Sequence, residues 1–146
     1  MMFRASVKIG RAIEDAYGFL WGLDERDFSS NELVPVYEKT TPGPRGVGTV
    51  IREVVKTPFF TLEIISEIVE VKPNERLAYV FHSDRFSGEL TYTFEAEGYA
   101  TRVCQCHSIS LRGFNRLLAP FVALFFPYMI DRRLRGIKKL LESEPR

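Results

Sequence analysis

The spacing of apolar residues restricts the fold of this chain more than any other feature of its sequence. Through most of the chain, apolar and polar side chains alternate, as in strands with one buried face. Spacings of three and four occur in two segments, 12–23 and 113–142, which predicts a short helix and a long C-terminal helix. The predicted strands cover residues 3–9, 33–41, 48–56, 59–71, 76–83, 86–98 and 100–111. The sequence therefore predicts an α+β fold with about seven antiparallel strands.

Turn residues separate the predicted strands. The run TPGPRGVG at 41–48 is rich in proline and glycine, which predicts an exposed loop, and Lys72-Pro73-Asn74-Glu75 predicts a type I turn. Pro35 has no backbone N–H to donate, so its strand is predicted at a sheet edge. The polar stretch 24–32 is compatible with a short second helix or with a turn.

The C-terminal helix has two apolar stripes. One stripe contains Phe114, Leu118, Phe121 and Phe125, and the other contains Ile130, Leu134, Ile137 and Leu141. At about 100° per residue these stripes lie roughly half a turn apart, and Pro127 stands between them. We therefore expect a kink or break at Pro127. We also expect the sheet to enclose the Phe121 and Phe125 face and to leave Leu124 and Phe126 open to a partner or membrane.

Length and composition predict one globular domain over residues 1–146. The net charge of +1, without a dense Lys/Arg run, gives no reason to expect nucleic acid as a partner. The N-terminal segment lacks the apolar core of a signal peptide, which predicts a cytoplasmic protein. Cys104 and Cys106 lie two residues apart on a predicted strand, too far for an unstrained disulfide, which is consistent with a reducing compartment.

The order of elements resembles the helix-grip fold of START-related, birch-pollen-allergen and polyketide cyclase/dehydrase-like proteins, the SRPBCC superfamily. Local segments are also similar to that superfamily: Ile13-Glu14-Asp15-Ala16-Tyr17 after the first strand, EVKPNERL at 70–77, and Ala100-Thr101-Arg102-Val103 at the start of the last strand. The resemblance implies a curved sheet wrapped around the last helix, with a hydrophobic cavity for a small apolar molecule between them. It implies no cofactor and no catalytic motif.

Candidate cavity residues are aromatic, apolar or polar side chains that share the predicted inner face. They are Tyr79, Phe81, Leu90, Tyr92, Phe94, Gln105, His107, Phe121, Phe125 and Tyr128. The same residues are equally compatible with a filled core, because packing and ligand binding leave one signature in a sequence. The charged residues Arg52 and Glu63 are expected in solvent, because an unpaired buried charge is costly.

His107 is the one catalytic candidate, as a proton donor or acceptor in enol or aldol chemistry. The alternative is a histidine that is simply hydrogen-bonded in the core. No metal site is expected at Cys104-Gln105-Cys106-His107, because on a strand His107 points away from both cysteines.

The apolar segment at residues 117–135 ends in a basic cluster, which suits peripheral contact with an anionic membrane or a homodimer interface. A fully uncharged run of about fourteen residues is too short to cross a bilayer. Three functions remain open: a binding or carrier protein for a lipid, quinone or polyketide-like molecule, which we favour over an enzyme; a polyketide cyclase/dehydrase-like enzyme that uses His107; and a protein-interaction module that uses the last helix.

Overall fold

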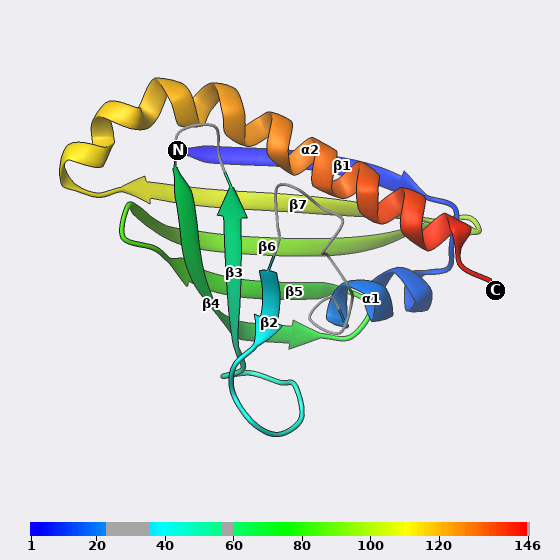
Figure 1. Cartoon of the computed structure of the whole chain (residues 1–146). Coiled ribbons are helices and arrows are strands. Elements are labelled where there is room, and N and C mark those ends of the chain that lie inside the picture. Colours follow the sequence, from blue (N-terminus) through cyan, green and yellow to red (C-terminus); the bar gives the residue numbers. More distant parts are fainter. Residues whose placement is uncertain (23–35, 57–59, 146) are drawn as a thin grey trace.

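The computed structural model describes residues 1–22, 36–56 and 60–145. Its strands form one antiparallel sheet in the order β1-β7-β6-β5-β4-β3-β2, and α2 lies across one face of that sheet (Figure 1). The strands are β1 (Met2–Ile9), β2 (Val36–Lys39), β3 (Val50–Lys56), β4 (Thr61–Lys72), β5 (Arg76–His82), β6 (Phe86–Glu97) and β7 (Ala100–Leu111). The helices are α1 (Ile13–Trp21), the 3-10 helix η2 (Gly113–Leu118) and α2 (Ala119–Ser143). The predicted seven-stranded helix-grip architecture is confirmed.

The described part of the predicted 33–41 strand, β2, lies at the sheet edge, as predicted. Pro35 itself and the possible second helix at 24–32 lie outside the described residues. The type I turn at 72–75 was wrong in detail. The Glu75 N–H donates to the Lys72 carbonyl at 3.0 Å, but Asn74 has a φ of 62°. A positive φ at the third position excludes a type I turn and fits type II, where asparagine tolerates the left-handed conformation.

α2 continues through Pro127 without a break. One expectation about the last helix was wrong. Phe126, which was expected to face outward, is buried against the sheet, with its ring centroid 5.2 Å from that of Phe3. Phe126 belongs to the stripe that continues through Ile130, Leu134, Ile137 and Leu141, all buried. The apolar face of α2 therefore stays on one side, because Phe126 precedes Ile130 by one helical turn.

The C-terminal end of α2 is tied to the start of the chain. Buried Arg11 donates hydrogen bonds to the carbonyls of Leu141 at 2.7 Å and Glu144 at 3.1 Å. The Gly10 N–H donates to Glu142 at 2.7 Å. In contrast, η2 has no buried residue, and the first fully buried residue of α2 is Phe126. The two ends of the C-terminal segment thus differ in how firmly they are held.

Gly88 is the position in β6 where a side chain would fit worst. A Cβ there would lie 1.9 Å from the Ser108 carbonyl oxygen and 2.8 Å from the Phe81 ring. We expect Gly88→Ala to lower the free energy of unfolding by about 1–3 kcal/mol or more, because the β6–β7 ladder must shift. Gly18→Ala in α1 is the matched control. It meets nothing within 4 Å and should stabilise the helix by about 0.5–1 kcal/mol. Urea unfolding of both variants measures the difference, and an unchanged Gly88→Ala protein would contradict this packing.

Candidate ligand-binding site

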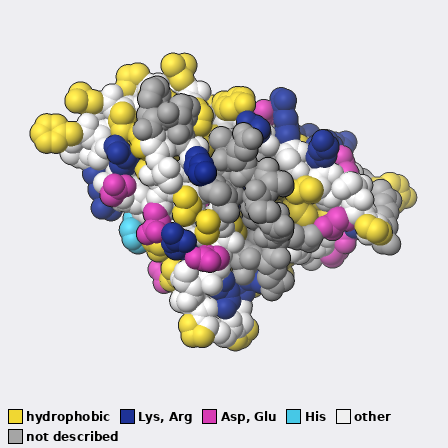
Figure 2. Space-filling model, viewed as in Figure 1, with side chains coloured by type: hydrophobic (Ala, Val, Ile, Leu, Met, Phe, Trp, Pro, Cys, Tyr) yellow, Lys and Arg dark blue, Asp and Glu magenta, His cyan; other side chains and the backbone are white. Residues whose placement is uncertain are grey.

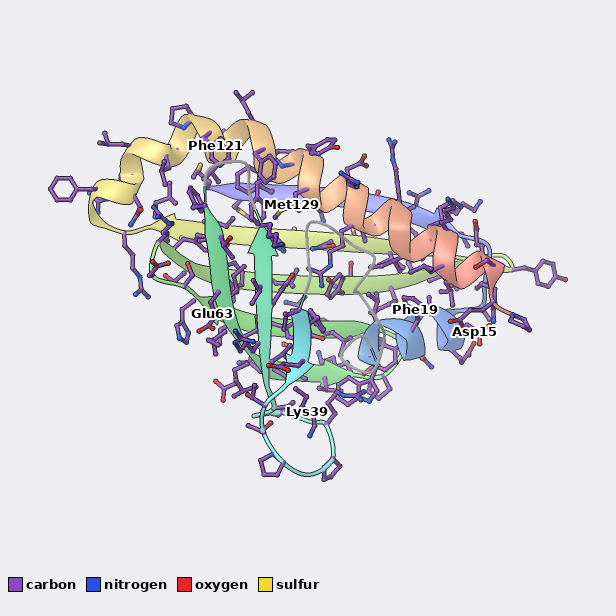
Figure 3. The ribbon with its side chains drawn as sticks, viewed as in Figure 1. Asp15, Phe19, Lys39, Glu63, Phe121 and Met129 are labelled. Atoms are coloured by element: carbon purple, nitrogen blue, oxygen red, sulfur yellow. The ribbon has the colours of Figure 1, made fainter. Side chains whose placement is uncertain are left out.

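An apolar groove lies between the first half of α2 and the neighbouring ends of the strands. Phe121 stacks on Phe125 with ring centroids 5.3 Å apart, and Phe60 meets Phe121 edge-on at 6.3 Å. The Arg85 guanidinium lies over the Phe60 ring at 4.1 Å and is the only charged group among the described residues of the lining. Figure 3 shows Phe121 and Met129 on α2, and Glu63 well away from that helix on β4. The lining is Val55, Phe60, Leu62, Ile64, Arg85, Phe86, Ile109, Leu111, Leu118, Phe121, Val122, Phe125, Phe126 and Met129.

The free space in this groove is small. It measures about 40 Å³, enough for a few water molecules, whereas pockets for drug-sized ligands measure about 300–1,000 Å³. Side chains of the described residues therefore fill most of this groove. A ligand larger than a few waters has to displace part of the lining.

A buried ion pair lies further along the same side of the sheet. Arg133 of α2 donates to Glu53 of β3 at 3.2 Å, and both side chains are less than one-fifth exposed. The Arg133 guanidinium also lies 5.5 Å from the centre of the Tyr37 ring on β2. Burial opposes the charge of Arg133, but nearby Tyr92, Glu53, Tyr37 and Tyr79 raise its pKa, so the guanidinium remains charged.

Two tyrosines from neighbouring strands surround this ion pair. Tyr79 and Tyr92 are buried, and their rings meet edge-on with centroids 6.2 Å apart. Burial raises the pKa of Tyr92, so its hydroxyl keeps its proton at neutral pH. The Tyr92 hydroxyl has no hydrogen-bond partner among the described residues.

Gln105 and His107 extend the polar cluster along β7. The Gln105 amide nitrogen lies 3.1 Å from Nε2 of His107. Burial, followed by the charge of Arg133, lowers the pKa of His107 to about 3, so the imidazole is neutral at pH 7. Nε2 therefore accepts the amide hydrogen bond, and the ring proton lies on Nδ1. Neither His107 Nδ1 nor Gln105 Oε1 has a hydrogen-bond partner among the described residues.

The polar cluster and the groove are continuous. The His107 ring lies 5.0 Å from the ring of Phe126, which lines the groove, and 5.8 Å from Phe81. Ile109, two residues further along β7, lines the groove as well. One side of the sheet thus offers an apolar compartment next to three unpartnered polar atoms.

The structure brings most of the predicted cavity residues to this side of the sheet. Tyr79, Phe81, Tyr92, Gln105 and His107 are buried there. Half-buried Leu90 of β6 lies opposite Tyr79 of β5 on one side and His107 of β7 on the other. Phe121 and Phe125 are also half-buried, and both line the groove.

Two predicted residues lie elsewhere. Phe94 packs under α1, with its ring 5.3 Å from that of Tyr17. Tyr128 is 56% exposed, and its hydroxyl accepts a hydrogen bond from Arg132 at 3.3 Å. Tyr128 is outside the groove because it lies about half a turn from Phe126 on α2.

Sequence reasoning missed Glu53, Arg133 and Tyr37. A signal for the first two was present. Glu53 stands between Ile51 and Val55, which alternation places on the buried face, and Arg133 follows Phe126 by two helical turns. An acid and a base on opposing buried faces indicate an ion pair. Arg52 and Glu63, expected in solvent, form an exposed pair at 2.8 Å.

No protein-family model and no curated protein matches this sequence. Solved structures do match. A Thermus thermophilus protein, TTHA0849, has a TM-score of 0.82 and 22% identity, covering 97% of each chain. An aromatase/cyclase from Streptomyces, ZhuI, has a TM-score of 0.76 and 12% identity, covering 97% of this chain and 93% of its own.

Norcoclaurine synthase from Thalictrum flavum has a TM-score of 0.71 and 12% identity, covering 99% of this chain and 87% of its own. At these identities the likeness concerns the fold, and function has to be argued from the site. The seven-stranded antiparallel sheet, the long C-terminal helix and these structural neighbours together show that the chain has the helix-grip fold.

Proposed function

We propose that this protein binds a small, largely apolar molecule between α2 and the sheet and acts as a binding or carrier protein. The observation that carries the proposal is the set of three buried, unpartnered polar atoms beside an apolar groove: Tyr92 Oη, Gln105 Oε1 and His107 Nδ1. A buried polar atom without a partner costs about 1–3 kcal/mol. A ligand that hydrogen-bonds to these atoms regains that free energy on binding.

The three atoms specify the polar end of the ligand. His107 Nδ1 carries a proton to donate, Gln105 Oε1 only accepts, and the Tyr92 hydroxyl does either. The Arg133–Glu53 pair already balances the charge nearby. The matching group is therefore neutral, with both a donor and an acceptor, such as a phenol or an alcohol. A related observation on a protein of this fold is that norcoclaurine synthase has been solved with dopamine and hydroxybenzaldehyde, two small aromatic molecules.

Entry of a ligand requires the groove to open. The weakly held segment is the one that covers it, because η2 has no buried residue and α2 has none before Phe126. The other end of α2 is fixed by Arg11 through Leu141. An outward movement of the first turns of α2 would enlarge the groove without unfolding the core.

The lowered pKa of His107 is unfavourable for the enzyme alternative that uses this residue. With a pKa of about 3, the imidazole has no extra proton to give at neutral pH and is a weak base. A proton shuttle works best with a pKa near the working pH. We therefore favour binding over acid–base catalysis by this residue.

Equilibrium dialysis with 2-naphthol and naphthalene tests the proposal, because the two probes differ by one hydroxyl. We expect wild-type protein to bind 2-naphthol about two- to tenfold more tightly, corresponding to one hydrogen bond of about 0.5–1.5 kcal/mol. Gln105→Leu and Tyr92→Phe should each reduce this preference. Tyr17→Phe, which removes a hydroxyl from α1, is the matched control and should retain this preference. Equal affinity of wild-type protein for the two probes, or binding of neither, would refute the proposal.

A further inference from the structure

The outer face of η2 and of the first half of α2 is apolar and exposed. Phe114 is 93% exposed, and Leu117 and Leu124 are each 81% exposed. Figure 2 shows hydrophobic side chains gathered at the end of the molecule where η2 and the first turns of α2 lie in Figure 1. Leu124 and Tyr128 lie one turn apart on the face of α2 opposite Phe126, and the exposed Leu117 lies on η2 just before α2. Isolated exposed apolar residues are normal, but an aligned set this exposed marks an interaction surface.

The charges around this face are of one sign. Between Arg112 and Ile130 the sequence has no acidic residue. Arg112 and Arg116 flank Phe114 on the surface, and Arg132 follows Tyr128 by one turn. None of these three arginines is paired with a carboxylate among the described residues. The face therefore combines protruding apolar side chains with uncompensated positive charge.

We propose that this face, defined by Phe114, Leu117, Leu124 and Tyr128 with Arg112, Arg116 and Arg132, docks on the surface of an anionic phospholipid bilayer. The apolar side chains enter the boundary between headgroups and acyl chains, and the arginines contact the lipid phosphates. The proposal rests on exposure and charge alone, so it does not depend on whether the groove binds a ligand.

Charge argues against a second copy of this chain as the occupant. A two-fold dimer through this face would bring the arginines of one copy against those of the other, because both partners of such an interface present the same patch. An anionic membrane supplies the missing negative charge. It also accepts a protruding side chain such as Phe114 without needing a complementary pocket.

The helix lies on the membrane in this proposal and does not cross it. Residues Gly113–Ser143 are long enough and apolar enough to span a bilayer by length and composition, and only 11% of the most apolar window is buried. The second half of α2, however, supplies Ile130, Leu134 and Ile137 to the core of the sheet. Within Gly113–Ser143, η2 and the outer face of the first half of α2 are therefore the parts free to contact lipid.

Co-sedimentation with vesicles tests this proposal. We expect wild-type protein to sediment with vesicles of equal parts phosphatidylcholine and phosphatidylglycerol, and far less with phosphatidylcholine alone. Leu117→Ser and Leu124→Ser should each lower the partition coefficient about tenfold, from the loss of one buried leucine. Because these side chains are exposed, the variants should fold as wild type does. Tyr99→Ser is the matched control, since Tyr99 is fully exposed on the β6–β7 turn and should leave binding unchanged.

The charge contribution is measured with Arg112→Gln and Arg116→Gln, each expected to lower binding to anionic vesicles about fivefold. Lys139→Gln, an exposed cation in the second half of α2, is the control. Three results would overturn the proposal: no sedimentation with anionic vesicles, unchanged sedimentation of Leu117→Ser and Leu124→Ser, or a wild-type dimer in analytical ultracentrifugation that Leu124→Ser dissociates. The last result would assign the face to a second copy.

Discussion

Glu53→Gln is expected to lower the free energy of unfolding by about 3–5 kcal/mol, because it leaves the buried Arg133 charge without its partner. Arg133 cannot lose its proton to relieve this cost, since its pKa is raised by its surroundings. Guanidinium chloride unfolding, with the slope checked for two-state behaviour, measures the effect.

Two further variants separate the lost ion pair from a general weakening of the sheet. Glu63→Gln removes one partner of the exposed Arg52 pair on the neighbouring strand and should change stability far less. The double variant Glu53→Leu with Arg133→Met replaces both charges by apolar groups, and should recover most of the stability that Glu53→Gln loses. If Glu53→Gln and Glu63→Gln had equal effects, the buried ion pair would not be a feature of the folded protein.

Acidification is expected to destabilise the wild-type protein through His107. Below its ordinary pKa of about 6.5, the imidazole takes up a proton in the unfolded state, but in the folded state it does so only near its lowered pKa of about 3. The unfolded state therefore binds more protons in this window, and its free energy falls as the pH falls. The contribution of His107 to the free energy of unfolding is fully present above about pH 6.5. It falls by about 1.4 kcal/mol per pH unit as the pH is lowered from there to about 3.

The difference between wild type and His107→Gln isolates this contribution from carboxylates that titrate in both proteins. Between pH 6 and pH 4, the free energy of unfolding should fall by about 2.5 kcal/mol more in wild type than in His107→Gln. His82→Gln, which replaces the other histidine, an exposed one, is the control for the substitution itself. Parallel profiles for wild type and His107→Gln would mean that His107 is solvated in the folded protein.

The sequence was sufficient to predict the fold because strand and helix periodicities are local properties. Alternation along Ala100–Leu111 placed Val103, Gln105, His107 and Ile109 on one face, and all four are buried. The prediction failed where side chains from distant segments decide the outcome. Phe126 was placed outside because Pro127 was taken to change the helix face, whereas the hydrogen bond that proline removes did not break α2.

The candidate site was only half predictable. Aromatic residues on alternating strand positions identified Tyr79 and Tyr92, but the Arg133–Glu53 pair joins residues 80 positions apart. The position of each turn of α2 over the sheet depends on contacts between distant segments. The periodicity of the sequence therefore does not predict it. The free volume of the groove was likewise beyond the sequence, because filled and ligand-bound cores use the same residue types.

We propose that a small apolar molecule with a neutral polar end binds between α2 and the sheet. The most direct test is isotope-filtered NMR of methyl-labelled protein with 2-naphthol, which detects contacts between the probe and individual methyl groups. We expect contacts from Ile109, Val122 and Met129, which line the groove. Contacts confined to Leu117 and Leu124 on the outer face of the C-terminal segment, or no contacts at all, would contradict it.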